Sequence, residues 1–203
     1  AGYPDHERHQ RWLGAFTDDA ERSSLLRQPT TVHPYDAQKG YFEGVTDRGA
    51  YLNRLLWSYA RTYMMDEVLV KVDRASMAHG LEARTPFLDT ALSEYVLTLP
   101  YEYKYKRFTG KRLLKSVMRG KLPTAIIDRP KKGFGIPLAR WLRTDMNALM
   151  HTLLSEDALT KSGLFQPDRI RVLMEEHESG AADHRKKLWT LMVFQMWFQK
   201  WYV

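Results

Sequence analysis

Cysteine is absent from the 203-residue chain, and so are long apolar runs. Without cysteine the chain can form no disulfide, carry no thiol nucleophile and build no zinc site on thiolates. No run reaches the roughly 18 apolar residues that would span a membrane, and no signal-peptide pattern follows Ala1. We therefore expect a cytoplasmic protein, and the missing initiator methionine leads us to expect a fragment or a processed chain.

Motifs that would mark a self-contained active site are also missing. There is no GxxxxGK[ST] and no GxGxxG phosphate loop, so no complete nucleotide site can be argued from this chain. The GxSxG motif of many serine hydrolases is absent, so nothing in the sequence supports that class of enzyme. His6 and His9 lie three residues apart on an expected helix, but no third ligand is evident, so we predict no metal site.

The residues that are present predict a mostly α-helical globular chain. Hydrophobic residues make up 44% and charged residues 27%, which is typical of a folded domain. Helical spacing of apolar residues is common and strand-like alternation is scarce. The predicted helices cover 4–16, 66–80, 111–119, 138–154, 167–178 and 184 to near the end, with others capped by Asp18 or Asp19, by Asp47, and by Asp89 or Thr90; we expect a loop over 28–46.

The segment 66–80 carries an unusual mixture of side chains. Asp66 and Glu67 are placed to begin a helix, and Gly80 is placed to end it. Its apolar residues lie nearly all round the helix, which predicts burial on more than one side. The charged residues Lys71, Asp73 and Arg74 lie inside the same segment. Because buried charges need partners, the helix either holds an ion-pair network or borders a polar site.

Positive charge is concentrated in one part of the sequence. Residues 101–143 contain 13 Lys or Arg but two acids, whereas the rest of the chain is slightly acidic. Such a stretch suits nucleic acid, an acidic protein or a phosphate-bearing small molecule, although a solvated face without a partner is the plainer interpretation. Interleaved aromatic residues, on which bases could stack, keep a nucleic-acid-binding module as an alternative: Tyr101, Tyr103, Tyr105 and Phe108.

The loop 128–135, with the sequence DRPKKGFG, combines positively charged side chains with proline and glycine residues that set its backbone conformation. Arg129, Lys131 and Lys132 cluster where Pro130 stiffens the chain and Gly133 permits close backbone approach. A lysine on such a loop can neutralise charge on phosphate oxygens. An exposed basic turn without a ligand is the alternative.

Two long motifs resemble the asparagine synthetase family. They are EVLVKVDRASMAHGLEARTPFLD over 67–89, and RPKKGF over 129–134, which continues into a Pro137 and a Trp141 that the family also has. The resemblance covers essentially the whole chain. It implies the helical C-terminal portion of an α/β adenine-nucleotide α-hydrolase-like (ATP pyrophosphatase) synthetase domain, here spanning 1–203, whose parallel sheet is missing from this chain.

The resemblance implies a ligase reaction for the parent enzyme. Members of the family adenylate the side-chain carboxylate of aspartate with ATP and release pyrophosphate. Ammonia, made from glutamine by a glutaminase domain, then attacks the acyl carbon to give asparagine and AMP. Relatives apply the same chemistry to other carboxylates, so a related amide-forming synthetase is one alternative. A basic nucleic-acid-binding module and a helical interaction domain without chemistry are others.

The resemblance also implies roles for individual residues. Lys131 matches the family's catalytic lysine, which contacts pyrophosphate and the acyl-adenylate, with Arg129, Lys132 and Gly133 as supporting residues. Glu67, or its neighbour Asp66, is a candidate for acid/base or orienting work, with simple helix capping as the alternative. The remaining polar residues that match the family's signature are expected to form a buried polar network at the wall of the site: Asp73, Arg74, Ser76, Glu82, Arg84 and Asp89.

Parts of the family pattern are absent from the chain. The SGGxDS pyrophosphate loop is missing, and so are an acidic segment expected before Ala1 and the cysteine of the glutaminase. We therefore expect the chain to be inactive alone and to need the glutaminase and pyrophosphate-loop portions as partners. ATP and Mg²⁺ are expected in the parent enzyme and not on this chain alone. Exposed former core predicts self-association.

Overall fold

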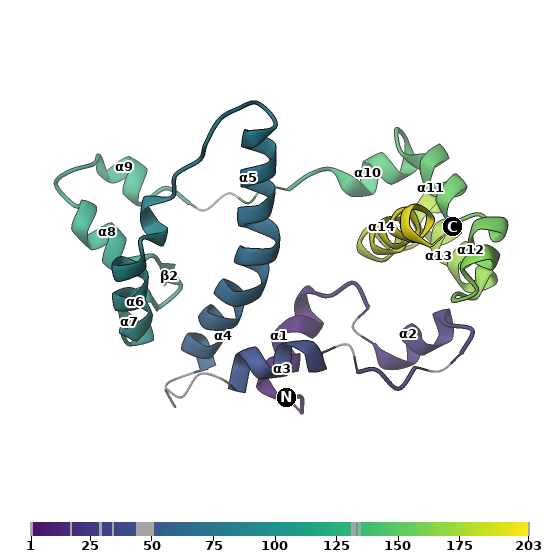
Figure 1. Ribbon diagram of the computed structural model, residues 1–203, viewed down its shortest axis with the longest axis horizontal. Helices are drawn as coiled ribbons and strands as arrows, with labels where there is room; N and C mark the ends of the chain where they lie inside the picture. The colour runs from purple at the N-terminus through teal and green to yellow at the C-terminus, as the bar shows by residue number, and fades with distance from the viewer. Residues whose placement is uncertain are drawn as a thin grey trace. The chain divides into compact units, whose positions relative to one another are not determined.

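A computed structural model of the chain describes residues 2–16, 18–28, 30–33, 35–43, 51–130, 133 and 135–202 (Figure 1). Nearly all the regular structure in these ranges is helical, and the strands among them form one two-stranded sheet. The prediction of a mostly α-helical chain is confirmed. None of the described helices is long and apolar enough to cross a membrane.

The chain divides into two compact units, each made from two stretches of sequence. The first unit holds residues 1–6 and 34–132, and the second holds residues 7–33 and 133–203. The prediction that 1–203 is one helical part of a larger synthetase domain is not tested by this division and stays a prediction.

The elements of the first unit are mostly short helices. In chain order they are α3 (Asp36–Glu43), α4 (Tyr51–Tyr59), the π-helix η1 (Ala60–Leu69), α5 (Val70–Met77), the 3₁₀ turn η2 (Pro86–Leu88), α6 (Thr90–Thr98), α7 (Tyr101–Lys104), β1 (Tyr105–Lys106), β2 (Thr109–Gly110), α8 (Arg112–Met118) and α9 (Thr124–Ile127). The side chain of Asp89 caps α6 by accepting a hydrogen bond from the amide of Leu92 at 3.0 Å, as the sequence predicted.

Residues 51–77 form one continuous helix, of which η1 is the middle part (Figure 1). The predicted helix start at Asp66 is therefore wrong, because the helix is already several turns long there. The predicted burial is wrong as well: neither η1 nor α5 has a buried residue, and Val72 and Met77 are 43% and 53% exposed. The apolar residues are present, but the described parts of the unit do not cover them.

The predicted loop over 28–46 contains a helix, α3. Gly40, which favoured a loop in the sequence, lies inside this helix, where it is tolerated at a modest cost in free energy. The predicted helix cap at Asp47 lies outside the described residues.

The second unit is built from helices that share a core. Its elements are α2 (Asp19–Leu25), α10 (Leu138–Arg143), α11 (Asn147–Leu153), α12 (Glu156–Ser162), α13 (Pro167–Ser179) and α14 (Arg185–Trp201); α1 (Asp5–Leu13) has residues in both units. The predicted helix over 138–154 is broken at Thr144, whose backbone is neither helical nor extended (φ −128°, ψ −95°), so that α10 and α11 are separate helices.

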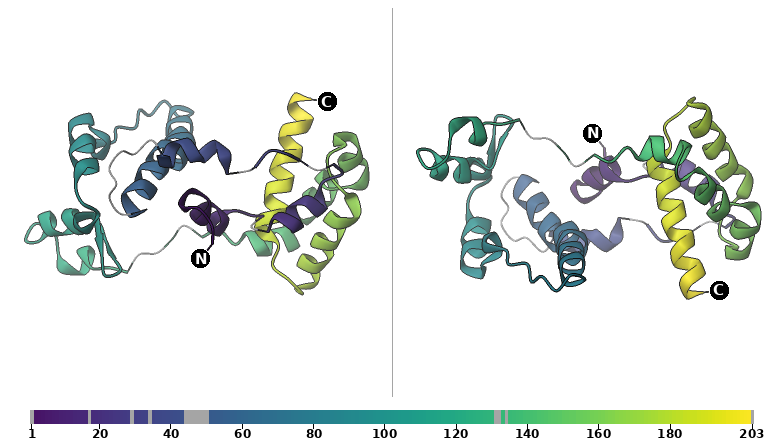
Figure 2. Two further views of the ribbon diagram at one scale, coloured as in Figure 1. Left: turned by 90° about the horizontal axis from the view of Figure 1, so that it is seen from below. Right: turned by 90° about the horizontal axis from the view of Figure 1, so that it is seen from above.

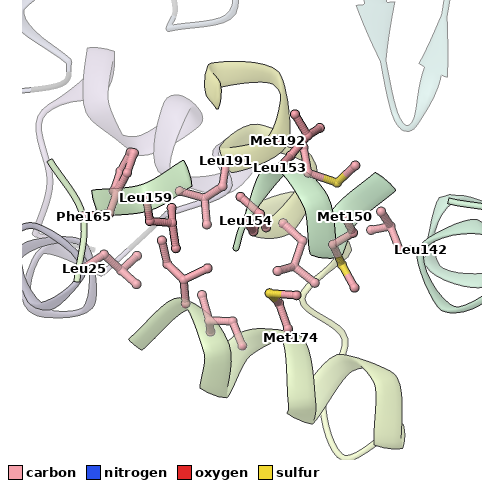
Figure 3. Close-up of a cluster of buried hydrophobic side chains, with 13 residues drawn as sticks. Leu25, Leu142, Met150, Leu153, Leu154, Leu159, Phe165, Met174, Leu191 and Met192 are labelled. Carbon is pink, nitrogen blue, oxygen red and sulfur yellow. The ribbon is translucent and has the colours of Figure 1, made fainter. Parts of the chain in front are cut away.

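The core of the second unit lies between α14 and the helices around it (Figure 3). Leu188, Leu191, Met192 and Gln195 are the buried residues of α14, and their spacing of three and four places them on one face. Helices α11, α12 and α13 lie beside α14 in both views of Figure 2. The helix predicted from 184 to near the end is confirmed, and its buried residues join the core because apolar residues at this spacing leave water together.

Helix α2 joins this core through main-chain hydrogen bonds to a segment far along the sequence. The amide of Arg27 donates to the carbonyl of Leu164 at 2.9 Å, and the amide of Gln166 donates to the carbonyl of Leu25 at 2.8 Å. Asp18 caps α2 as predicted, accepting from the amides of residues 20 and 21. Gly180 ends α13 in the left-handed conformation (φ 79°), close to the predicted end of this helix at 178.

Candidate functional site

The basic loop that follows α9 is the first candidate site, and the structure describes only part of it. Arg129 and Gly133 are described and exposed, whereas Lys131 and Lys132 lie outside the described residues. Arg129 forms no ion pair with any described acid. A side chain at Gly133 would meet no atom within 4 Å, so packing within this chain does not require glycine there.

The start of this loop is held by a two-pronged ion pair. The guanidinium of Arg119 donates from Nη1 to Oδ2 of Asp128 at 2.7 Å and from Nη2 to Oδ1 at 2.8 Å. These hydrogen bonds lower the pKa of the Asp128 carboxyl, so it is ionised at neutral pH. The pair connects the residue after α8 to the residue before Arg129, and we call it the 119–128 clamp.

Sequence reasoning missed Arg119, although a usable signal was present. Asp128 is one of two acids among 13 basic residues in 101–143, so a partner for its carboxylate was to be expected nearby. The spacing of nine residues follows no helical or strand repeat, and the clamp forms because Gly120, in the left-handed conformation (φ 79°), turns the chain after α8.

Glu67 lies near the C-terminal end of η1 and forms a local ion pair. Its Oε1 is 3.2 Å from Nζ of Lys71, four residues on, and both side chains are more than half exposed. Helix capping is excluded for Glu67, because the helix begins at Tyr51. The backbone around Glu67 is π-helical, a conformation that is rare in proteins.

The remaining motif residues do not form the predicted buried network. Asp73 and Arg74 are exposed, and Ser76 donates from its hydroxyl to the carbonyl of Asp73 at 3.1 Å. Glu82 and Arg84 pair at 2.7 Å with side chains 67% and 82% exposed. No other described segment covers these residues in this chain, and the buried network expected at the wall of the parent enzyme's site stays a prediction.

The structure does not bring the two groups of candidates together by direct contact. Within the described ranges, no hydrogen bond or ion pair joins Glu67 to Arg129 or to the motif residues 73–89. What the structure shows is therefore two separate local arrangements: an acid in a π-helix, and an unpaired guanidinium that follows the 119–128 clamp.

Metal binding finds no support in the part of the chain that the structure describes. No three His, Asp or Glu side chains there come close enough together to hold an ion. The side chain of His9, proposed above as half of a histidine pair with His6, lies outside the described residues. The described residues do not fit a Mg²⁺ site, and no chemical step is assigned to that ion.

Comparison with known proteins gives one family. The family model described as asparagine synthase matches residues 1–199. Asparagine synthetase [glutamine-hydrolyzing] 1 of Bacillus subtilis is 29% identical over 192 residues, which are 92% of this chain and 30% of the relative. A putative asparagine synthetase [glutamine-hydrolyzing] of Mycobacterium tuberculosis is 32% identical over 137 residues, or 67% of this chain and 21% of the relative.

A mammalian relative agrees with the bacterial ones. The asparagine synthetase [glutamine-hydrolyzing] of Mesocricetus auratus is 32% identical over 148 residues, covering 63% of this chain and 25% of the relative. The chain thus spans less than a third of the length of these relatives. No solved structure gives a significant match.

Proposed function

Because the chain belongs to the asparagine synthase family, we propose that it is the helical C-terminal part of the synthetase domain of a glutamine-hydrolysing asparagine synthetase. The parent enzyme adenylates the side-chain carboxylate of aspartate with ATP, and pyrophosphate leaves. Ammonia from glutamine then attacks the acyl carbon, giving asparagine and AMP. The observation that carries the proposal is the family match over residues 1–199.

The remaining parts of the reaction are assigned to portions of the parent enzyme outside this chain. The α/β adenine-nucleotide α-hydrolase-like sheet and its pyrophosphate loop belong to the preceding part of the parent, and the glutaminase lies further upstream. Two observations support this: the chain is helical, and it spans 21–30% of the relatives' length. ATP, aspartate and glutamine are substrates of the parent, which works in the cytoplasm, and the chain alone is inactive.

Lys131 supplies the charge that the reaction needs. Negative charge builds on pyrophosphate and on the acyl-adenylate oxygens, and a fixed ammonium beside them stabilises it. Arg129, whose guanidinium is unpaired among the described residues, adds a second cation, and Lys132 and Gly133 complete the loop. The 119–128 clamp holds the start of the loop, so its cations reach the anion with less loss of conformational entropy.

Glu67 acts in the second step of this proposal, the attack of ammonia on the acyl carbon. Its carboxylate accepts a proton from the attacking ammonia or orients a group that does so. The ion pair with Lys71 is exposed, and exposed pairs of this spacing are weak, so the carboxylate can exchange Lys71 for another partner. The same chemistry would act on another carboxylate substrate, so the experiment below compares aspartate with other carboxylic acids.

The experiment is ATP–pyrophosphate exchange dependent on aspartate. It compares the 203-residue chain with the product of the longer reading frame that includes the upstream sequence. Exchange is expected in the longer protein only. Exchange by the 203-residue chain at the rate of the longer protein would refute the proposal, and exchange with another carboxylic acid but not with aspartate would change the substrate.

Two substitutions in the longer protein test the residue roles. Lys131→Ala is expected to slow exchange about 10²–10³-fold, the usual cost of losing one group that stabilises developing charge. Lys121→Ala removes an exposed lysine from the same basic stretch and is expected to leave the rate within about twofold. Equal losses in both variants would show that only the overall charge matters.

Self-association of the isolated chain follows from the same proposal. Large apolar side chains of the first unit are exposed, among them Leu81 at 65% and Phe87 at 67%, where the parent's sheet would cover them. Light scattering is expected to give a mass that rises with concentration, and Leu81→Ser with Phe87→Ser is expected to reduce the rise. A mass of 23.8 kDa at all concentrations would contradict this expectation.

A further inference from the structure

A small hairpin between α7 and α8 carries cations that the proposed ligase does not use. Strands β1 and β2 pair antiparallel, with Tyr105 opposite Gly110 and Lys106 opposite Thr109. The two-residue connection, Arg107 and Phe108, has positive φ at both positions (48° and 63°). Such a turn matches the twist of the strands and projects its side chains outward, and Phe108 is 96% exposed.

Two adjoining hollows lie on this hairpin. One, of about 310 Å³, is lined by Lys106, Arg107, Thr109 and Arg112. The other, of about 580 Å³, shares Lys106 and Arg112 and is completed by Glu102, Tyr103, Leu113 and Ser116. Volumes of this order accommodate small ligands. The lining of the first hollow is three cations and a hydroxyl, without an acid.

The charges of the three cations are not neutralised within the described part of the chain. Lys106, Arg107 and Arg112 form no ion pair with a described carboxylate. Arg112 is nevertheless held in place, because its Nη1 donates to the main-chain oxygen of Glu102 at 2.5 Å. That bond occupies one donor and leaves the rest of the guanidinium fork to face the hollow.

The neighbouring Lys104 shows the contrast. Its Nζ lies 3.2 Å from Oδ1 of Asn53 and 3.1 Å from the carbonyl oxygen of Leu97, so its charge is directed into the unit's own structure. Lys106 and Arg107 form no such internal bond among the described residues, and Arg112 commits one donor, to Glu102. Carboxylates that could serve them are scarce, since Glu102 is the one acid that lines either hollow.

We propose that Lys106, Arg107, Thr109 and Arg112 form a binding site for an oligophosphate, a short chain of phosphate groups. Guanidinium groups bind phosphate oxygens through two parallel hydrogen bonds, an ammonium adds a point charge, and the threonine hydroxyl donates one further bond. Three unpaired cations match an anion with several negative charges better than a single carboxylate. The proposal does not depend on the ligase, whose candidate residues lie elsewhere in the sequence.

The test is calorimetric titration of the 203-residue chain with inorganic tripolyphosphate. Saturable one-to-one binding is expected, weaker at 200 mM than at 50 mM salt because the contacts are ionic. Arg107→Asn is the informative variant, since asparagine tolerates positive φ and the hairpin keeps its shape. It is expected to weaken binding about tenfold, which is the effect of losing one charged hydrogen bond.

Lys121→Asn is the matched control. It removes the same charge from the same basic stretch, but Lys121 is exposed and lines neither hollow. The affinity of Lys121→Asn for tripolyphosphate is expected to stay within about twofold of that of the unsubstituted 203-residue chain. Equal weakening in the two variants would show a diffuse electrostatic attraction and would overturn the site. Melting curves of both variants confirm that folding is unchanged, and Lys106→Ala replaces Arg107→Asn if that variant unfolds.

Further titrations identify the source of the anion. ATP binding of similar strength, equally weakened by Arg107→Asn, would support a site for the phosphate tail of a nucleotide as well as for free tripolyphosphate. Binding of ATP without tripolyphosphate, binding of a single-stranded oligonucleotide alone, or no saturable heat at all would overturn the proposal. If Lys131→Ala abolishes tripolyphosphate binding while Arg107→Asn does not, the anion sits at the ligase loop, so this inference fails and the ligase stands.

Discussion

His177, on α13, is fully buried and its protonation state is set by its neighbours. The amide of His184 donates to Nδ1 at 3.2 Å, so Nδ1 carries no proton. Nε2 therefore carries the hydrogen and donates to the carbonyl of Ala139 at 3.2 Å. Burial, together with the charge of nearby Arg143, lowers the pKa of His177 below its ordinary value of 6.5.

This arrangement predicts that the chain loses stability in mild acid. Well above pH 6.5 the imidazole is neutral in both the folded and the unfolded chain, so it contributes no pH dependence there. Below pH 6.5 the unfolded chain binds a proton that the folded site disfavours, and stability falls until the pH passes the lowered folded pKa. Melting temperatures at pH 7.5 and pH 5 are expected to show this fall.

A comparison of two variants assigns the pH effect to His177. His177→Gln is expected to melt lower at both pH values but to lose much of the difference between them. His151→Gln changes an exposed histidine that pairs with Glu178 and should keep the difference attributed to His177. If His177→Gln kept the full pH dependence, another group would be responsible.

Gln195 is a buried amide with no hydrogen-bond partner among the described residues. It lies on the core-facing side of α14, and both Oε1 and Nε2 are enclosed. Because an enclosed polar group without a partner costs about 1–3 kcal/mol, Gln195→Leu is expected to raise the free energy of unfolding by that order. Chemical denaturation followed by circular dichroism measures the change.

Gln199 supplies the matched control for this substitution. It lies one turn further along α14 and is exposed, so Gln199→Leu relieves no buried amide and should change stability by less than about 0.5 kcal/mol. A loss of stability in Gln195→Leu would mean that the amide is satisfied in solution, for example by an enclosed water molecule.

At the scale of elements, α14 organises the second unit through one face. Leu188 is completely buried there, against α10 to α13. Leu188→Ala is expected to lower the free energy of unfolding by about 2–5 kcal/mol, since it removes buried methyl groups and leaves a cavity. Val193→Ala, on the same helix but 43% exposed, is expected to cost far less. Similar losses in both would show that α14 is covered on its outer face as well.

The elements divide into those that local signals predicted and those that they did not. Helix α2 begins after Asp18 and α13 ends at Gly180, as the cap residues indicated, because capping acts within one turn. The π-helix η1 has no comparable local signal. The break between α10 and α11 at Thr144 was missed for the same reason: the sequence there is compatible with a helix, and tertiary packing decides.

At the scale of the whole molecule, the basic stretch 101–143 is less available to a polymer than its charge suggests. Arg119 is committed to Asp128, Lys104 bonds to Asn53, and Arg143 donates to the carbonyl of His177 at 2.6 Å. We therefore expect no sub-micromolar binding of single-stranded DNA or RNA. Fluorescence anisotropy at about 50 and 200 mM salt checks this, because binding driven by phosphates weakens steeply over that range.

The opposite result would change the functional conclusion. Tight, salt-sensitive binding would favour the nucleic-acid-binding module, with exposed rings such as Tyr103 and Phe108 as stacking positions. Reversing one hairpin charge with Arg107→Glu would then weaken binding and lower its salt dependence, whereas under the ligase proposal there is no such binding to weaken.

The helical class, several helix ends and the family could be predicted from the amino-acid sequence, because caps, periodicity and long motifs are local properties of the chain. The exposure of Asp73, Arg74, Glu82 and Arg84, the π-helix around Glu67 and the pairing of Arg119 with Asp128 became visible in the folded chain alone. The reason is physical: burial and pairing between separated residues depend on what packs over them, and no window of sequence contains that information.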